Sequence, residues 1–193
     1  MRIVLELIFV ILLGLGLGGV LSVVSIQNNL GFGAVTIGQW TAWPQAGSRD
    51  ADPYTKAKVA ANGEVPLGAA EGIAFHSRLD SKGEALALNC QYQITGQTPP
   101  ARFWTLTAHN IDGSIVGTPS GGAATIHSRN IIRQSSGKIV VMTGPFMSGG
   151  NWVETSGKGP YELVLRLYDT QITSTSGLLD PEMPEIILMG CQS

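Results

Sequence analysis

The sequence has little charge. Asp, Glu, Lys and Arg make up 13% of its 193 residues, about half the usual share. The 12 basic and 14 acidic residues give a formal net charge of −2, so there is no basic surplus with which to bind nucleic acid. The shortage lies at one end of the chain, because residues 1–48 carry only Arg2 and Glu6. The remaining residues have the composition of an ordinary soluble domain.

Recognisable catalytic motifs are also missing. The sequence has no G-x-S-x-G nucleophile elbow and no H-E-x-x-H zinc motif, and its three histidines, His76, His109 and His127, are far apart. Acidic residues are sparse, and the sequence does not show which two could face each other across a glycosidic bond. We therefore predict no catalytic residues, no metal and no cofactor, and we favour a protein that is not an enzyme.

Cysteine is rare as well. The two cysteines, Cys90 and Cys191, lie 101 residues apart and form no C-x-x-C pair, which argues against a metal or redox motif. In an oxidising compartment we expect one disulfide between a central strand and the C-terminal end. Closing so long a loop is worth roughly 4–5 kcal/mol in the chain-entropy description. The alternative is a pair of buried free thiols.

A long hydrophobic run is present. The twenty residues 7–26, LIFVILLGLGLGGVLSVVSI, carry no charge, and a helix of that length crosses about 30 Å of hydrocarbon. The run is longer than the apolar part of a signal peptide, and no small-x-small cleavage site follows it. We predict an uncleaved anchor within residues 1–30 and one domain over residues 31–193; the alternative is a cleaved signal peptide.

Two further expectations follow from this run. Arg2 precedes it and the next charge is Arg49, so the positive-inside rule places the N-terminus in the cytoplasm and exports the rest. Gly14 and Gly18 form a G-x-x-x-G pair, which lets a second helix approach closely. The alternative is that these glycines reflect only the general frequency of glycine in membrane helices.

The exported part has the pattern of a β-rich domain. Asp52 as N-cap, Pro53 at the first position and Gly63 after the last turn predict a helix over residues 53–62. Beyond it, apolar residues alternate with period two between Gly- and Pro-containing turns. We predict a mainly β fold, an antiparallel β-sandwich or jelly-roll-like domain with one short helix. The expected strands are residues 73–79, 85–94, 102–110, 125–132, 138–143, 161–168 and 185–189.

A group of aromatic and polar residues is a candidate binding surface. Aromatic side chains combined with Arg and Asn are typical of surfaces that bind sugars or peptides, and such residues recur over several of the expected strands. The alternative is that the tryptophans pack in the core and the arginines pair with nearby acids. The candidate residues are Trp104, Arg129, Asn151, Trp152, Arg166 and Tyr168, in segments that also hold His109, His127 and Asn130.

Four stretches of the domain resemble the Domain of Unknown Function 1214 family. They are residues 51–75, 90–113, 150–169 and 183–187, and the runs FWTLTAHNIDG and GNWVETSGKGPYELVLRLYD are their most specific parts. Asn151, Trp152 and Arg166 match the family pattern, whereas the order Ser128-Arg129-Asn130 departs from it. The resemblance implies a β-sandwich, a single span before the domain in short members, and a companion domain of unknown function numbered 1254; it implies no established reaction.

Together these observations predict a protein of the bacterial inner membrane with one span and a periplasmic β-sandwich. We expect a non-catalytic interaction or envelope-associated module whose partner carries the companion domain. The alternative function is the binding or hydrolysis of a periplasmic glycan.

Overall fold

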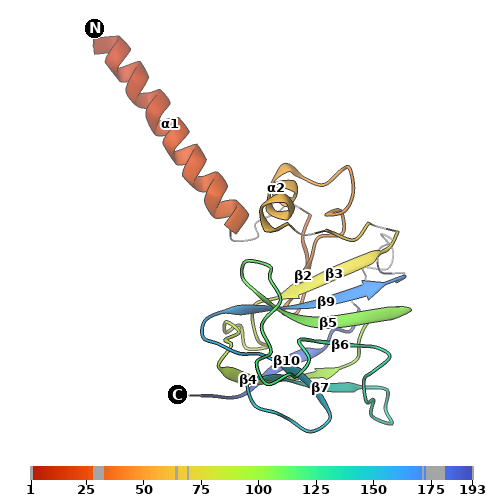
Figure 1. The fold of residues 1–193 in the computed structure, drawn as a ribbon. Coiled ribbons are helices and arrows are strands. Elements are labelled where there is room, and N and C mark those ends of the chain that lie inside the picture. Colours follow the sequence, from red (N-terminus) through yellow and green to blue (C-terminus); the bar gives the residue numbers. More distant parts are fainter. Residues whose placement is uncertain are drawn as a thin grey trace.

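The computed structural model of the chain describes residues 2–27, 33–63, 65–68, 70–170, 172 and 181–192. It begins with a long helix, α1 (Arg2–Gln27), which extends away from a β-rich domain (Figure 1). Residues 2–24 of α1 are long and apolar enough to cross a membrane, and none of that stretch is buried in the protein. A signal sequence has the same properties, so the length and composition of α1 fit both a membrane anchor and a signal sequence.

The second helix, α2 (Pro53–Asn62), has the predicted bounds. The Asp52 carboxylate accepts hydrogen bonds from the main-chain N–H groups of Tyr54, at 2.9 Å, and Thr55, at 3.1 Å. At the other end Gly63 has a φ of +62° and donates its N–H to the carbonyl of Val59, a conformation that glycine adopts without strain. These two caps are local, which explains why the sequence predicted this helix so closely.

In the part of the domain that the structure describes, the strands form two sheets, and all strand pairs are antiparallel except the parallel pair β7–β8. The predicted mainly β, two-sheet fold with one short helix is therefore confirmed. The six-stranded sheet has the order β1 (Val35–Ile37), β2 (Trp40–Ala42), β3 (Gly72–Ser77), β9 (Tyr161–Tyr168), β5 (Phe103–Asn110), β6 (Thr125–His127). The four-stranded sheet has the order β10 (Glu185–Cys191), β4 (Cys90–Gly96), β7 (Ile139–Gly144), β8 (Asn151–Glu154).

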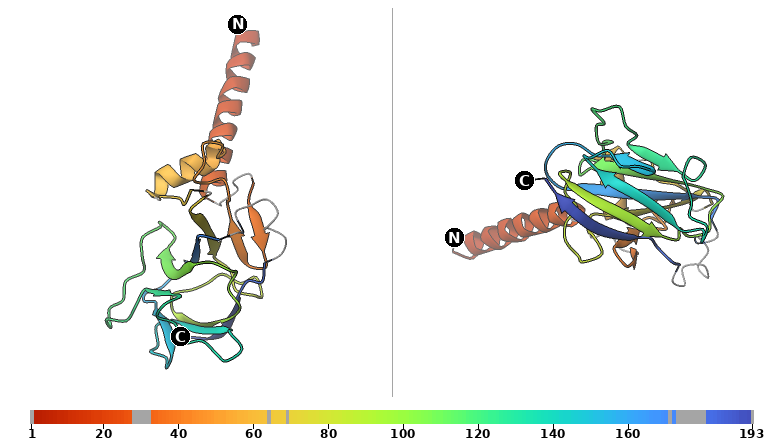
Figure 2. Two further views of the ribbon diagram at one scale, coloured as in Figure 1. Left: turned by 90° about the vertical axis from the view of Figure 1, so that its right-hand side faces the viewer. Right: turned by 90° about the horizontal axis from the view of Figure 1, so that it is seen from below.

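The two sheets pack face to face and enclose one core (Figure 2). Strand β9 lies near the middle of the larger sheet, between β3 and β5. Its odd-numbered residues from Tyr161 to Leu167 face inward and are almost completely buried, as the period-two pattern predicted. From the smaller sheet, Ile94, Val141 and Ile186 meet them in the same core. The even-numbered residues of β9 point to the outer face of the larger sheet.

Several strand predictions need correction. The strand expected over residues 85–94 begins only at Cys90, because Leu86 bonds with Arg78 and Tyr161 in irregular backbone before it. The strand expected over 125–132 ends at His127. Strand β8 was not predicted, nor were the bounds of β1 and β2.

Trp40 lies in β2, is completely buried and donates its Nε1–H to the carbonyl of Pro184 at 2.7 Å.

Candidate binding surfaces

The six predicted binding residues separate into two groups in the structure. Trp104 points inward from β5 and is 2% exposed. Asn151, at the start of β8, is also buried, and its amide is used by the main chain. Its Oδ1 accepts from the N–H of Ile132 at 2.7 Å, and its Nδ2 donates to the carbonyls of Ile132, at 2.7 Å, and Val140, at 2.9 Å. Asn151 therefore fixes a loop to β7.

Trp152 belongs to the smaller sheet. It is half-buried, and its Nε1–H donates to the carbonyl of Gly144 at 3.1 Å. Gly122 lies directly against its ring, so that a Cβ at this glycine would be 2.8 Å from Trp152 Cζ3. The indole thus packs against the loop before β6 and does not join the other aromatic candidates.

The remaining three candidates share the outer face of the larger sheet. Tyr168, at the end of β9, has its ring centroid 5.7 Å from that of Phe103 on β5, and Phe103 is 5.5 Å from the His127 ring on β6. The Arg129 guanidinium lies 5.7 Å from the Phe103 centroid, within the range of a cation–π contact. We call Phe103, His127, Arg129, Arg166 and Tyr168 the aromatic–basic face. It brings together Arg129, Arg166 and Tyr168 of the predicted set.

Arg166 lies in the middle of this face, between small neighbours. Its partners across the sheet are Ala74 on β3 and Thr105 on β5, and its Nη1 is 3.4 Å from Nε2 of His109. Nδ1 of His109 is 2.8 Å from the Gly113 carbonyl, which can only accept, so the proton is on Nδ1 and Nε2 accepts from Arg166. Burial lowers the pKa of His109, and the positive charge of Arg166 lowers it further. A neutral His109 thus orients the guanidinium.

A buried carboxylate lies next along the same face. Glu162 of β9 has Oε1 2.9 Å from Nδ1 of His76 and Oε2 3.4 Å from Nη2 of Arg78. The ring of Trp43 stands edge-on to His76, with 5.8 Å between the centroids. Two partners hold the charge of Glu162, as a buried carboxylate requires. His76, Glu162 and Phe103 were not predicted as members of this face. Each of them alternates with inward-facing residues on its strand, so the period-two pattern could have placed all three on the outer face.

All three histidines lie on strands of the larger sheet, yet they do not form a metal centre. Within the described ranges there is no group of three His, Cys, Asp or Glu side chains close enough to hold a metal ion. Two of the histidines instead contact a charged side chain: His76 contacts Glu162, and His109 contacts Arg166. The chemistry that this arrangement offers is recognition, through planar rings and guanidinium groups.

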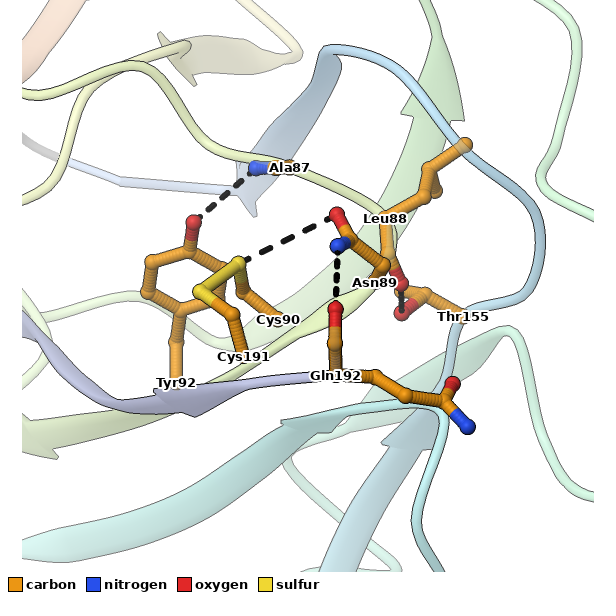
Figure 3. The surroundings of a disulfide bond; sticks show 8 residues. All are labelled: Ala87, Leu88, Asn89, Cys90, Tyr92, Thr155, Cys191 and Gln192. Atoms are coloured by element: carbon orange, nitrogen blue, oxygen red, sulfur yellow. Dashed lines mark hydrogen bonds between the residues drawn. A yellow bond between two sulfur atoms is a disulfide. The ribbon is translucent and has the colours of Figure 1, made fainter.

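The smaller sheet carries the disulfide. Cys90 of β4 and Cys191 of β10 are bonded, with a Cα–Cα distance of 3.9 Å (Figure 3), so the predicted pairing is confirmed. Figure 3 also shows the bonds that hold the surroundings: Asn89 Nδ2 donates to the Gln192 carbonyl at 2.9 Å, and the Tyr92 hydroxyl accepts from the N–H of Ala87 at 2.9 Å. The C-terminal strand is thereby fixed to β4.

An apolar region lies beside the outer face of the smaller sheet. Phe146 and Met147 are exposed on the loop between β7 and β8, Met147 to 80%. A groove of about 200 Å³ lies between Ile132 and Met142, with Gly149 and Gly150 among its other lining residues. Because exposed apolar side chains beside a groove are typical of contact sites, this loop and the groove together are a second candidate, the apolar region, which the sequence did not predict.

The structure is a β-sandwich domain preceded by an apolar helix. The chain belongs to the family described as "Protein of unknown function (DUF1214)", which matches residues 71–172. This confirms the resemblance seen in the sequence.

Solved structures similar to the chain include the following two. The VPA0106 protein from Vibrio parahaemolyticus has 21% identity and a TM-score of 0.58, over 72% of this chain and 36% of that one. A putative uncharacterised protein from Burkholderia cenocepacia has 14% identity and a TM-score of 0.41, over 76% of this chain and 45% of that one. The chain thus spans about a third of the Vibrio protein, which shares its fold. No curated protein matches it.

Proposed function

We propose that the chain is a single-pass protein of the bacterial inner membrane whose periplasmic β-sandwich acts as a non-catalytic interaction module. Its partner would be a protein that carries the companion domain of unknown function 1254. The observation that carries the proposal is the apolar loop between β7 and β8, where Phe146 and Met147 are exposed and Gly149 and Gly150 line a groove.

The apolar region beside the smaller sheet is the surface that suits such a partner. Phe146 and Met147 are exposed on the loop between β7 and β8, and Gly149 and Gly150 of the same loop line the groove together with Ile132. Large flexible side chains such as Met147 adapt to a protein surface and are common in contact sites. The partner that fits is therefore a folded domain with an apolar side chain that enters the groove.

The test is the isolation of the full-length, tagged protein from its own membranes in mild detergent. Mass spectrometry would identify the bound proteins and measure the intact mass of the bait. We expect a stoichiometric partner that carries the companion domain, together with an uncleaved N-terminus. Met147→Lys should release this partner, whereas Ile115→Lys, at an exposed site on a different loop, should not. A bait recovered alone would contradict the proposal.

A second function, the binding of a periplasmic glycan, is favoured by the aromatic–basic face. Tyr168 and Phe103 offer ring surfaces, and Arg166 offers guanidinium donors between small neighbours. The acid found on this sheet face, Glu162, already pairs with His76 and Arg78, so the face suits binding better than hydrolysis, which needs two acids placed across the bond.

The glycan hypothesis has its own experiment. The full-length protein in detergent would be titrated with oligogalacturonate, which is acidic, and with a neutral oligosaccharide of equal length. We expect Tyr168→Ala and Arg166→Ala each to weaken binding of the acidic sugar at least tenfold, and Met147→Lys to leave it unchanged. Equal binding of both sugars by all variants, or no binding by the natural sequence, would exclude this function.

A further inference from the structure

Strand β10 is an edge of the smaller sheet, and among the described residues no hydrogen bond is found along part of its outer side. The first part of that side is covered: the N–H of Ile186 donates to Oγ of Ser81 at 2.9 Å, and its carbonyl accepts from the N–H of Ser81 at 2.8 Å. In an antiparallel strand the direction of the main-chain groups alternates. Ile187 therefore bonds toward β4, while the N–H and carbonyl of Leu188 point away from the sheet.

The side chains of this segment are apolar. From Ile186 to Cys191 the strand has no charge, and Ile187, Leu188 and Met189 are 37%, 40% and 56% exposed. Soluble proteins usually protect such edges with lysine, proline, charge or a bulge. Here the strand is interrupted by a register shift of the β-bulge type between Leu188 and Gly190. The edge remains open at Ile187, Leu188 and Met189, and we call these three residues the window.

We propose that a second copy of this chain pairs with this window, edge to edge and antiparallel. A two-fold axis at Leu188 would let the two Leu188 residues exchange both of their free main-chain hydrogen bonds. Ile187 of each copy would then lie opposite Met189 of the other, which gives two apolar cross-strand pairs. The uncharged strand meets itself without repulsion, and each Glu185 lies three residues from the axis.

The direction of α1 agrees with this symmetry. A two-fold axis between paired antiparallel strands is perpendicular to their sheet, and Figure 2, right, looks onto the smaller sheet from the side opposite to α1. Helix α1 leaves the domain away from that sheet (Figure 1), so the axis would send both α1 helices toward the same side. Two copies joined in this way can be anchored in one membrane.

The helix also offers a second, weaker contact. Nothing lies within 4 Å of a Cβ placed on Gly14 or Gly18, so this surface of α1 is open to a second helix. A window of a few residues gives a weak interface alone. Two contacts linked through one chain strengthen each other, because the first raises the effective concentration for the second.

The experiment measures the oligomeric state of the full-length protein in mild detergent by sedimentation velocity. Leu188→Pro removes the free N–H without removing a bond to β4, since proline is tolerated where an edge N–H faces solvent. Met189→Lys leaves the main chain intact and places a charge in the window. Ile115→Lys is the matched control, because it puts the same charge on an exposed apolar site elsewhere.

We expect the natural sequence and Ile115→Lys to be dimeric, and both edge variants to raise the dimer dissociation constant at least tenfold. A monomeric natural protein would overturn the proposal, as would dimers that persist in both edge variants. Loss of the dimer only in Gly14→Leu/Gly18→Leu would assign it to the helices and also overturn it. The outcome is independent of the companion-domain partner, which is identified by its own mass.

Discussion

At the scale of single residues, Asn151 is a side chain whose polar atoms all form hydrogen bonds within the fold. Its amide makes three hydrogen bonds to the main chain of Ile132 and Val140 inside the protein. Asn151→Ala would leave those groups buried without partners, at about 1 kcal/mol for each bond. We expect a loss of about 3 kcal/mol in the free energy of unfolding, measured by urea titration.

The matched control is Asn130→Ala. Asn130 is exposed and its Oδ1 accepts one bond, from the N–H of His127 at 2.8 Å, so its loss should cost about 1 kcal/mol or less. A cost for Asn151→Ala no larger than this would show that water or a rearranged loop replaces the lost bonds.

His109 gives a residue-scale prediction about pH. Burial and Arg166 hold the pKa of His109 below its usual value, so the unfolded chain takes up this proton first as the pH falls below about 6.5. The free energy of unfolding should therefore decrease as the pH falls from 6.5 to the lower pKa of the folded state. Below that pKa His109 is protonated in both states and causes no further loss of stability.

The pH prediction is checked with His109→Asn, which keeps a donor for the Gly113 carbonyl but does not titrate. Urea midpoints would be measured at pH 7.5 and 5.5 for both proteins. The natural sequence should lose more stability between these pH values than the variant does. Because the two proteins differ only at His109, an equal loss in the two would show that His109 plays no part.

At the scale of elements, the pairing of β3 with β9 depends on a close approach at Gly72. A Cβ on this glycine would lie 2.0 Å from the Leu167 carbonyl oxygen, which belongs to the main chain and cannot rotate away. Gly72→Ala should therefore separate the two strands and cost about 2–3 kcal/mol. Gly117→Ala, where a Cβ meets nothing within 4 Å, should change thermal stability little, and equal effects of the two would contradict this account.

The elements also show what a sequence can and cannot predict. Strand β9 and helix α2 were predicted with their full bounds, because alternation and caps are local signals. Strand β8 was missed because it is only four residues long, Asn151–Glu154. It also pairs in parallel with β7, so the two strands are not joined by a hairpin turn that a sequence pattern could reveal. The strand before Cys90 was predicted too long because apolar alternation continues through the irregular residues 85–89, which bond to distant segments.

The same distinction applies to the candidate surfaces. Arg166 and Tyr168 share a face by the alternation of a single strand, which a sequence reveals. That Phe103 and His127 stand beside them depends on the order β9–β5–β6, and sequence alone does not give this order. Trp104 and Asn151 were grouped with the surface residues by type, but their direction was set by packing. A binding role for the six residues stays a prediction.

At the scale of the whole molecule, the anchor and the disulfide make one combined prediction. If α1 exports the domain, Cys90 and Cys191 meet an oxidising compartment and their bond forms. Alkylation of the denatured full-length protein should then find no free thiol. A variant without residues 2–27 stays in the cytoplasm, and we expect both of its thiols to react.

The single variant Cys90→Ser calibrates the assay, because one thiol should react wherever the domain is located. Loss of the bond also carries a cost in stability, since it closes a loop across 101 residues worth roughly 4–5 kcal/mol in the chain-entropy description. The cytoplasmic variant should therefore unfold at lower urea than the natural protein, and a reductant should remove the difference. Reactive thiols in the full-length protein would place its domain in a reducing compartment, and the proposed periplasmic role would fail with that result.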